Sequence, residues 1–511
     1  SGAAKIVLKR DGTILLGADH IEMLAAEAIN ADAAVVNLDN NSGDGEADQP
    51  SACSPTTGAP VNPVLGVKLL PGETDFMLAA PSPFAFTRSY LSRDARVGVL
   101  GQGWSIPGEG LGLELDHTAT VLIDAQGRRI TFGALAPGQS RFSRSERIWI
   151  RRGGPIAPQP EAYASWQGRW AAVPQALWHD SAAVFVLAGG AYYHFHCQQG
   201  RARLLGRFDR NGYTTHFEWQ TLAHGAQVLA RVRDSAGRTY GFAYRPCTPT
   251  RPDDPGVRLA GVALLNATAA ANASIPTPDT PDADWLVRYD YNPTGDLIAV
   301  TDRSGARVRH FDWHAHLLTA HGRPDGFEVR YTWDTLTPAG RVLRQSEAHG
   351  LTRDYAYGPD HTLVTDNLGR QERYHFEGAG PDTRWTAHTR ADGSRLSFQY
   401  DGLGRRIGET DPLGRTTRIE LDSEGRPVAY TLPDGSRWQH RLDPETGDLL
   451  AVDGPEGLSW RIEPDARGNP LAITAPGGGT TRYAYDDAQL PDRPTRITDP
   501  DGGERSLQWN R

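Results

Sequence analysis

The sequence predicts an all-β protein built from repeated antiparallel hairpins, and three observations carry this prediction. Glycine accounts for 56 of the 511 residues and proline for 36, so glycine stands at about 11% against about 7% in an average protein. The turn pattern Asp-x-x-Gly recurs along the chain, with short stretches of alternating apolar and polar residues between the turns. Helical periodicity is nearly absent, which leaves a meander of short strands.

The repeats are clearest in the C-terminal part. The motif Tyr400-Asp401-Gly-Leu-Gly404-Arg405 is followed by Asp411-Pro-Leu-Gly414-Arg415 and by Asp422-Ser-Glu-Gly425-Arg426. The half-period is about ten residues and the full period about 21, which indicates a repeat architecture. The series continues downstream at Asp443, Asp453, Asp465, Asp486 and Asp499. Weaker copies of the motif lie upstream and begin at Asp124, Asp209, Asp234, Asp302 and Asp366.

Each repeat unit has a simple physical interpretation. Aspartate at the head of a tight turn accepts hydrogen bonds from the following backbone, and the glycine three places later supplies a positive φ. The stretches 395–400 and 416–421 alternate in polarity and predict half-buried strands. Because no hairpin is stable alone, a long array must stack as a solenoid or wrap into a closed sheet.

Composition shifts predict the organisation of the chain. Residues 1–40 are expected to form a small N-terminal element, in which 20–29 is either a short helix or the rungs of a small β-structure. Residues 41–63 are rich in Gly, Pro, Ser and Asp and suggest a linker. An entry segment with the first repeats then occupies 64–245.

Two further segments complete this division. Residues 246–284 suggest a long loop or insertion, because Pro, Thr, Ala and Asp dominate them. Residues 285–511 are repeats, and we expect the array to be incomplete at the C-terminus. The apolar stretch 259–275 is short for a membrane span and holds Asn266 and Asn272 within glycosylation sequons, so a loop or strand is favoured.

Charge and cysteine content exclude several classes of protein. The 62 acidic residues outnumber the 53 basic ones and give a net charge of −9, which does not support a nucleic-acid partner. Cys53, Cys197 and Cys247 are too far apart for a CxxC metal knuckle or a disulfide framework, and we interpret them as free, buried thiols. The first residues show no basic-then-apolar signal peptide.

The stretch from Asn62 to Pro107 resembles the entry segment of the Rhs (rearrangement-hotspot) or YD-repeat proteins. The matching residues are Glu73, Asp75, Phe76, Phe84, Arg88, Tyr90, Ser92, Gly101, Gly103 and Trp104. With the repeats, the resemblance covers roughly residues 60–511. It implies a spiral sheet wound into part of a hollow cocoon, as in the insecticidal toxin-complex C proteins and the teneurins.

The resemblance also implies a function. In bacterial Rhs effectors the shell holds a C-terminal toxin domain and many are delivered by type VI secretion. The implied partners are the toxin domain and remaining shell of the same polyprotein, a spike protein of the VgrG or PAAR type and a chaperone. We therefore expect secretion by a contact-dependent system without a signal peptide, and a cytoplasmic location before delivery.

The chain departs from the family pattern at both ends. Family members commonly close the shell with an Asp-Pro-x-Gly segment linked to aspartyl self-cleavage, whereas Asp411-Pro-Leu-Gly414 lies in repeat phase and predicts an ordinary turn. No PAAR tip is visible before the shell. Apolar alternation at Ile6, Leu8, Ile14 and Leu16 leaves open that residues 3–40 are the tail of a spike-like β-structure or a plug.

Candidate chemistry is sparse, and we expect no catalytic, cofactor-binding or metal site and no cofactor. His310, His314, His316 and His321 form the one local histidine cluster, and His314 and His316 would share a strand face, but the spacing of a zinc site is not met. Tryptophans recur in repeat phase, which sheet packing explains more simply than sugar stacking: Trp219, Trp313, Trp333, Trp438, Trp460 and Trp509.

The sequence therefore predicts a structural shell segment that encapsulates a toxin and is not itself an enzyme. The alternative is an extracellular adhesion or carbohydrate-binding YD-repeat scaffold. A hollow volume would favour the first function, and aromatic platforms on the outer surface would favour the second.

Overall fold

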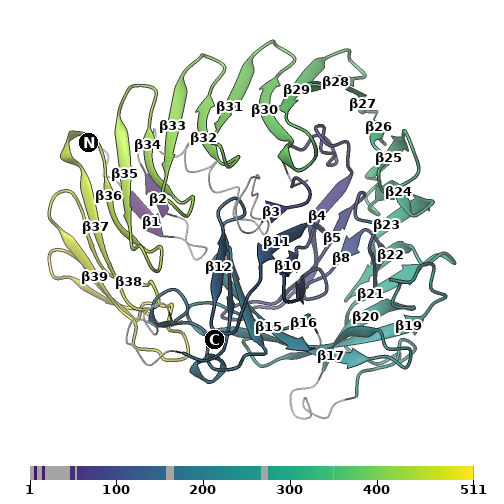
Figure 1. Cartoon of the computed structure of the whole chain (residues 1–511), viewed down its shortest axis with the longest axis horizontal. Coiled ribbons are helices and arrows are strands. Elements are labelled where there is room, and N and C mark those ends of the chain that lie inside the picture. Colours follow the sequence, from purple (N-terminus) through teal and green to yellow (C-terminus); the bar gives the residue numbers. More distant parts are fainter. Residues whose placement is uncertain are drawn as a thin grey trace.

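The structure is a computed structural model that describes residues 5–8, 14–17, 46–51, 54–156, 166–198, 200–265, 274–348 and 350–509. It confirms the predicted all-β class. One antiparallel sheet, which we call the wall, forms most of the molecule, and its strands β12 to β41 pair with one another in chain order. The wall curves into a ring, so that its last strands return toward β12 (Figure 1).

The first half of the wall contains longer strands than the second. These strands are β12 (Ser140–Ser143), β13 (Ile148–Arg152), β14 (Ala183–Ala188), β15 (Ala191–Gln198), β16 (Arg201–Phe208), β17 (Thr214–Thr221), β18 (Gln227–Arg233), β19 (Thr239–Pro246), β20 (Val257–Leu265), β21 (Trp285–Tyr291), β22 (Leu297–Asp302), β23 (Arg307–His314), β24 (Leu317–Gly322), β25 (Glu328–Trp333) and β26 (Val342–Glu347).

The second half keeps the repeat period with shorter strands. They are β27 (Thr352–Tyr357), β28 (His361–Asp366), β29 (Gln371–Glu377), β30 (Arg384–Thr389), β31 (Arg395–Tyr400), β32 (Arg406–Thr410), β33 (Thr416–Leu421), β34 (Pro427–Thr431), β35 (Arg437–Leu442), β36 (Leu449–Asp453), β37 (Ser459–Pro464), β38 (Pro470–Thr474), β39 (Thr480–Ala484), β40 (Arg496–Thr498) and β41 (Glu504–Ser506). Short 3-10 helices lie at η1 (Gln175–Leu177), η3 (Gly380–Asp382) and η4 (Pro455–Gly457).

The entry segment lies inside the ring of the wall (Figure 1). It forms a three-stranded sheet of β4, β5 and β8, a short pair of β6 and β7, and the strands β9 to β11, with β3 paired to β11. β9 also pairs with β16 and so connects the segment to the wall. The bounds are β3 (Glu46–Ala47), β4 (Leu69–Met77), β5 (Ala85–Leu91), β6 (Val97–Gly98), β7 (Gly101–Gln102), β8 (Trp104–Ser105), β9 (Gly112–Leu115), β10 (Ala119–Ile123) and β11 (Arg129–Gly133).

The structure corrects two expectations about chain organisation. The suggested linker 41–63 contains β3, and its residues Val61 and Asn62 are fully buried, so its described part packs as an integral piece of the fold. The suggested loop 246–284 contains β20, a nearly completely buried wall strand. Both errors arise because each segment contains a short apolar run that is flanked by turn-forming residues. The composition averaged over the whole segment hides such a run.

The N-terminal element is described only in part. β1 (Lys5–Leu8) and β2 (Ile14–Gly17) form an antiparallel pair, in agreement with the alternation of apolar residues there. The segment 20–29, Asn266, Asn272 and Cys53 lie outside the described residues. No helix in the described ranges is long and apolar enough to cross a membrane.

The Asp-x-x-Gly-Arg turn is a closed hydrogen-bonded unit. The Asp401 Oδ1 atom accepts hydrogen bonds from the backbone N–H groups of Leu403 and Arg405, both at 2.9 Å. The Arg405 Nε donates to Asp401 Oδ2 at 2.8 Å. Gly404 has φ +77°, a conformation that costs other residues roughly 1–2 kcal/mol. The same arginine–aspartate bond recurs at Asp124–Arg128, Asp234–Arg238, Asp366–Arg370, Asp411–Arg415 and Asp422–Arg426.

The aromatic residue that precedes many of these turns closes an opening in the wall. Between β30 and β31 the backbone ladder covers only the pairs from Ala387–Ser397 to Thr389–Arg395. Beyond it, the Tyr400 hydroxyl donates to the carbonyl oxygen of Trp385 at 2.6 Å. A β-bulge directly before Tyr400 interrupts its register with β32.

This bond recurs with a spacing of 15 residues, which accounts for the Tyr-Asp pair of the repeat. The tyrosine or tryptophan bridges one junction, and the aspartate closes the next turn. Equivalent donors and carbonyl acceptors are Trp219 to Leu204, Tyr244 to Leu229, Trp333 to Leu318, Tyr357 to Val342, Tyr485 to Pro470 and Trp509 to Pro494.

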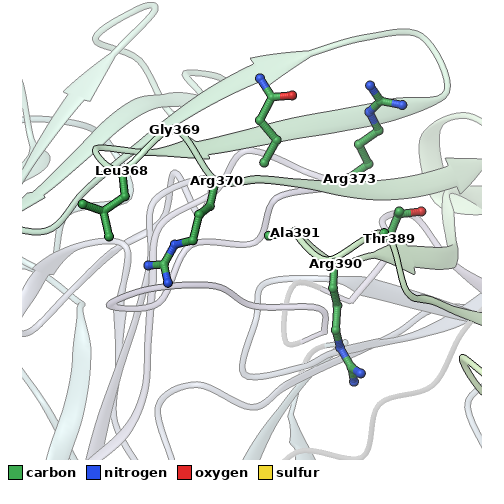
Figure 2. Close-up of a pocket in the computed structure, with 9 residues that line it drawn as sticks. Leu368, Gly369, Arg370, Arg373, Thr389, Arg390 and Ala391 are labelled. Atoms are coloured by element: carbon green, nitrogen blue, oxygen red, sulfur yellow. The ribbon is translucent and has the colours of Figure 1, made fainter.

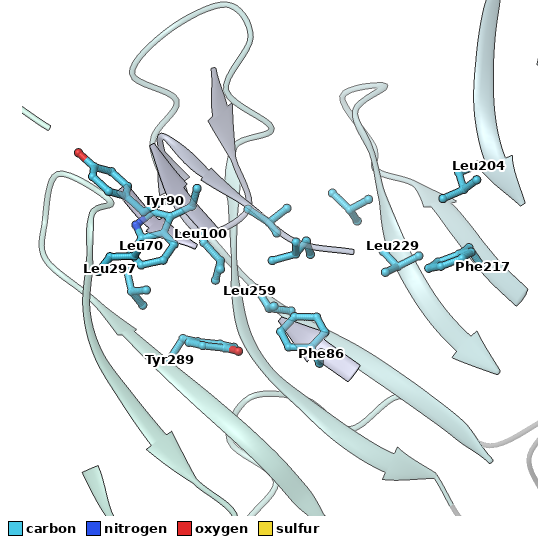
Figure 3. Close-up of a cluster of buried hydrophobic side chains, with 14 of the residues drawn as sticks. Leu70, Phe86, Tyr90, Leu100, Leu204, Phe217, Leu229, Leu259, Tyr289 and Leu297 are labelled. Carbon is cyan, nitrogen blue, oxygen red and sulfur yellow. The ribbon is translucent and has the colours of Figure 1, made fainter. Parts of the chain in front are cut away.

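The largest hydrophobic core lies where the entry segment meets the first half of the wall. Figure 3 shows Leu70, Phe86 and Tyr90 of the entry sheet beside Leu259 and Tyr289 of the wall. All five side chains are buried. Burial of such side chains stabilises the fold by about 1.5–3 kcal/mol each, so the entry segment is a structural layer that packs against the wall.

The second half of the wall is less covered on its apolar face. Ile419, Tyr430 and Trp438 are successive cross-strand neighbours on β33, β34 and β35, and all three are half-buried. The opposite face carries exposed charged residues such as Arg437, which forms an ion pair with Glu420. One face of these strands is therefore apolar and still partly accessible.

The Tyr400→Phe variant should be less stable by about 1 kcal/mol, because it loses the hydroxyl donor and leaves the Trp385 carbonyl without that partner. Guanidinium unfolding followed by circular dichroism measures the change. Tyr193→Phe is the matched control, since the Tyr193 hydroxyl has no hydrogen bond among the described residues. Equal stabilities of the two variants would contradict the bridging role of Tyr400.

Candidate functional site

A buried cluster of charges joins the entry sheet to the wall. Arg88 on β5 has a side chain only 1% exposed, and its Nη1 lies 2.7 Å from Glu73 Oε2 while its Nε lies 3.0 Å from Asp75 Oδ2. Asp75 also accepts a 2.6 Å hydrogen bond from the hydroxyl of Tyr289 on β21. Arg309 on β23 forms a second ion pair with Glu73. Two acidic residues of β4 are thus held by cations and a hydroxyl from three other strands.

The electrostatics of the cluster follow from its burial. Burial raises the pKa of Asp75, and the charge of Arg88 together with the Tyr289 hydroxyl opposes that rise. The Arg88 guanidinium lies over the ring of Trp104, 5.1 Å from its centroid, which adds a cation–π contact. The matching residues of the sequence motif therefore hold one another in place.

Lys68 extends this network toward β24 and β25. Its side chain is fully buried, and Nζ donates to the carbonyl oxygens of Ala59 at 2.6 Å and Leu69 at 2.7 Å. Burial lowers the pKa of Lys68 well below its ordinary value, and Glu73 opposes the shift. Ser92, also in the motif, accepts a 3.0 Å hydrogen bond from the Lys68 backbone N–H. Lys68 was not identified from the sequence. The one feature of the sequence that could have pointed to it is the rarity of lysine in an arginine-rich chain.

The remaining motif residues have packing roles. Phe76 and Phe84 form an aromatic cluster with Tyr240 of the wall, at ring-centroid distances of 5.5 and 5.3 Å. The Tyr90 hydroxyl accepts a hydrogen bond from the Leu318 backbone N–H at 3.2 Å. Gly103 has φ +76°, and a Cβ there would lie 2.8 Å from the Leu91 carbonyl oxygen, so no larger residue fits.

The two ends of the described wall meet along a line of side-chain contacts, which we call the seam. The Arg169 Nη2 donates to Glu424 Oε1 at 2.6 Å, and the Arg210 Nη2 donates to Asp448 Oδ2 at 2.9 Å. The Tyr213 hydroxyl donates to Asp492 Oδ1 at 2.6 Å. These pairs join residues that are more than 230 positions apart, so they close the ring through side chains.

The four candidate histidines do not converge. The Nδ1 of His316 lies 2.7 Å from Asp296 Oδ1, whereas the Nε2 of His321 lies 3.0 Å from the Tyr331 hydroxyl. His310 Nε2 is 3.5 Å from Glu328, and His314 is exposed. The expected shared strand face of His314 and His316 is wrong, because β23 ends at His314 and His316 lies in the turn with φ +63°.

The pKa of His321 lies far below the ordinary value of a histidine. Burial is the largest cause, and the nearby charges of Lys68 and Arg309 add to it, lowering the pKa of His321 to about 2. The ring is therefore neutral near pH 7. In the described ranges no group of three or more His, Cys, Asp or Glu residues is placed to hold a metal ion.

The other residues that the sequence analysis singled out have structural roles in the repeats or the wall. Asp411 forms the turn bonds of an ordinary repeat, and the Arg415 guanidinium lowers the pKa of its carboxyl group. Cys197 and Cys247 carry free thiols, as expected, but both are half-buried, which corrects the expectation that they are buried. Trp438 and Trp460 stack on one another at 6.1 Å within the wall.

A pocket of about 470 Å³ opens between the turns that flank β29 and β30. Figure 2 shows Arg370 and Arg390 pointing to one side of the strands and Arg373 to the other. Arg370 is held by Asp366 in the turn bond at 2.6 Å. The arginines thus diverge, and they do not form one convergent binding site.

The repeats, the curved wall and the buried entry segment define a class of β-repeat shell proteins. The chain matches the family model described as RHS Repeat at residues 382–416 and 465–504, and the model described as Domain of unknown function (DUF6531) at residues 58–132. It belongs to the Rhs or YD-repeat family, which confirms the resemblance of the entry segment.

Proteins similar to this chain include toxins. The chain is 50% identical over 469 residues to Toxin protein Tse5 of Pseudomonas aeruginosa, covering 91% of this chain and 35% of that protein. It is 28% identical to Double-stranded DNA deaminase toxin A of Burkholderia cenocepacia, covering 63% of this chain and 19% of that protein. The chain therefore spans about a third or less of the length of these relatives.

One of the solved structures that this chain matches is a crystal structure of TcdB2-TccC3. Its TM-score to this chain is 0.40 with 10% sequence identity, and the match covers 83% of this chain and 23% of that one.

The Arg88→Met variant should lose about 3–5 kcal/mol of stability, because it leaves the buried Asp75 without a counter-charge and leaves Glu73 with Arg309 as its one remaining cation. The raised pKa of Asp75 makes the native state bind protons more tightly than the unfolded chain, so stability falls as pH rises above the ordinary carboxyl range. Urea unfolding at about pH 5 and about pH 8 should show the larger loss at the higher pH. Adding Asp75→Asn should reduce this pH dependence, and an unchanged dependence would contradict the assignment to Asp75.

Charge reversal at the seam should open the ring. Arg210→Glu places like charges beside Asp448, and small-angle X-ray scattering should then show a larger maximum dimension. The double variant Arg210→Glu/Asp448→Lys restores opposite charges and should restore the wild-type dimension. If the single variant scatters like the wild type, the seam does not hold the ring closed.

Proposed function

We propose that this chain is a segment of a shell wall that encloses a toxin domain carried by the same polypeptide. The observation that carries the proposal is the uneven covering of the wall. Entry-segment side chains bury the inner face of the first half, whereas the apolar face of β33 to β35 stays half-buried. An apolar face that stays partly accessible is typical of a surface that contacts another polypeptide.

The construction of the wall supports confinement. Each strand from β13 to β40 has a backbone-paired neighbour on both sides, and the seam joins distant turns, so few strand edges are left open to other chains. A continuous hydrogen-bonded sheet separates its two faces from one another. Held behind such a wall, a cargo domain would be kept from its target until delivery.

The wider assignment rests on the family. Two of the relatives are named as toxins, and each is much longer than this chain, which supports a cargo on the remaining polypeptide. We propose a structural role without catalysis for this chain, contact-dependent secretion by the type VI system, and partners of the spike (VgrG or PAAR) and chaperone classes. Before delivery the protein would reside in the bacterial cytoplasm.

Limited proteolysis of the complete natural polypeptide tests encapsulation. Residues downstream of the wall should resist trypsin while the shell is folded, and should be cleaved once the shell is opened by Arg210→Glu. The control is the same downstream region expressed without the shell. Cleavage of the downstream region at equal rates with and without the shell would refute confinement.

A further inference from the structure

A groove of about 430 Å³ lies between the entry segment and the wall strands β30 to β34. One side is formed by residues of the entry segment such as Pro50 and Val64 and by the turn between β12 and β13. The other side is formed by apolar side chains of the wall that include Trp385, Phe398 and Ile419. The strands of the entry segment lie within the ring in Figure 1, so a groove between this segment and the wall opens on the inner face.

Two arginines meet at one end of this groove. A Cβ built on Gly425 would lie 3.2 Å from Arg405 Nη1 and 3.4 Å from Arg147 Cδ, so both side chains pass over this glycine. Gly425 has φ +77° and lies in the turn between β33 and β34. The turn thus leaves room for the two side chains because it carries no side chain of its own at that position.

The two guanidinium groups have donor capacity left over. Arg405 directs Nε and Nη2 to Asp401, but its buried Nη1 has no hydrogen-bond partner among the described residues. Arg147 makes no ion pair within 4.0 Å in the described part of the chain, although Asp422 attracts it from farther away. The other nearby cations are matched, Arg426 with Asp422 and Arg406 with Glu409. The groove therefore holds one surplus positive charge beside an apolar wall.

The backbone at Arg147 adds a second indication. Arg147 has φ +52°, a left-handed conformation that is uncommon for residues other than glycine and costs roughly 1–3 kcal/mol. The turn around it is otherwise well anchored, because the Glu146 backbone N–H donates to Ser143 Oγ at 3.0 Å. This strained position presents the arginine side chain toward the groove.

We propose that the groove binds an extended peptide segment that presents a carboxylate to Arg147 and Arg405 and apolar side chains to Trp385, Phe398 and Ile419. The proposal rests on the proposed function, since an enclosed polypeptide is the partner that the inner face would meet. A carboxylate would satisfy the unpaired Nη1 donor and neutralise the surplus charge through charge-assisted hydrogen bonds. The groove would hold the cargo by one acidic residue flanked by apolar ones.

The test compares two peptides on the purified full chain. The probes are dansyl-VLELV-amide and dansyl-VLQLV-amide, which differ only in the charge of the central side chain, and binding is followed by fluorescence anisotropy. The glutamate peptide should bind at least about ten-fold more tightly than the glutamine peptide. Equal affinities, or no binding of the glutamate peptide at about 1 mM, would overturn the proposal.

Matched variants distinguish the loss of peptide binding in the groove from a general effect of changing an arginine in a turn. Arg147→Gln and Arg405→Gln should each abolish the preference for glutamate, whereas Arg147→Lys should retain part of it. Arg415→Gln removes the same turn bond as Arg405→Gln outside the groove, and Arg144→Gln removes an exposed arginine from the same turn as Arg147. Both controls should keep the preference, and a preference that survives Arg147→Gln would contradict the site.

The outcomes also distinguish this inference from encapsulation itself. If the downstream region is protected from trypsin but the peptides do not discriminate, only the groove assignment fails. If the glutamate peptide binds selectively but the downstream region is unprotected, the groove stands as a peptide site and encapsulation fails.

Discussion

The structure depends on the requirement that every strand edge of a long hairpin array be hydrogen-bonded. Backbone ladders alone meet this requirement only in part, because the ladder between successive hairpins, as at β30 and β31, stops after a few residue pairs. The aromatic donors complete it, as Tyr400 does at the Trp385 carbonyl. Because these side chains fill the space where adjacent strands diverge, the sheet can curve and still leave few unpaired groups.

A second constraint acts at the entry segment, where charges are buried rather than removed. Glu73, Asp75 and Arg88 come from neighbouring strands of one small sheet, and Arg309 and Tyr289 come from the wall. Ion pairs of this kind contribute little net stability, but loss of one partner is costly, so they specify one way to dock the sheet. The surrounding aromatic core supplies the stability.

The seam differs in character from the rest of the wall. Strands within the wall are held by repeated backbone hydrogen bonds, whereas its ends are joined by a few partly exposed side-chain pairs such as Arg210–Asp448. Exposed ion pairs contribute about 0–1 kcal/mol each, much less than a strand ladder. A shell built this way would open along the seam first, while the repeats stay intact.

The sequence by itself determined the all-β class, the turns and the strand order, because these follow from local chemistry. Aspartate and glycine at fixed spacing close each turn, as at Asp401 and Gly404, and alternation sets the strand faces. The spacing of 15 residues between Tyr400 and its acceptor is also regular, although only the structure shows that a hydrogen bond spans it.

Only the tertiary structure decided which residues share a site. Arg147 and Arg405 lie 258 positions apart, and Arg210 and Asp448 lie 238 apart. It also revealed that Ala47, Val61 and Asn62 are buried and that β20 is a wall strand, where composition suggested a linker and a loop. Contacts over such separations depend on the curvature of the whole sheet, which is a sum of small twists and bulges that no local pattern in the sequence records.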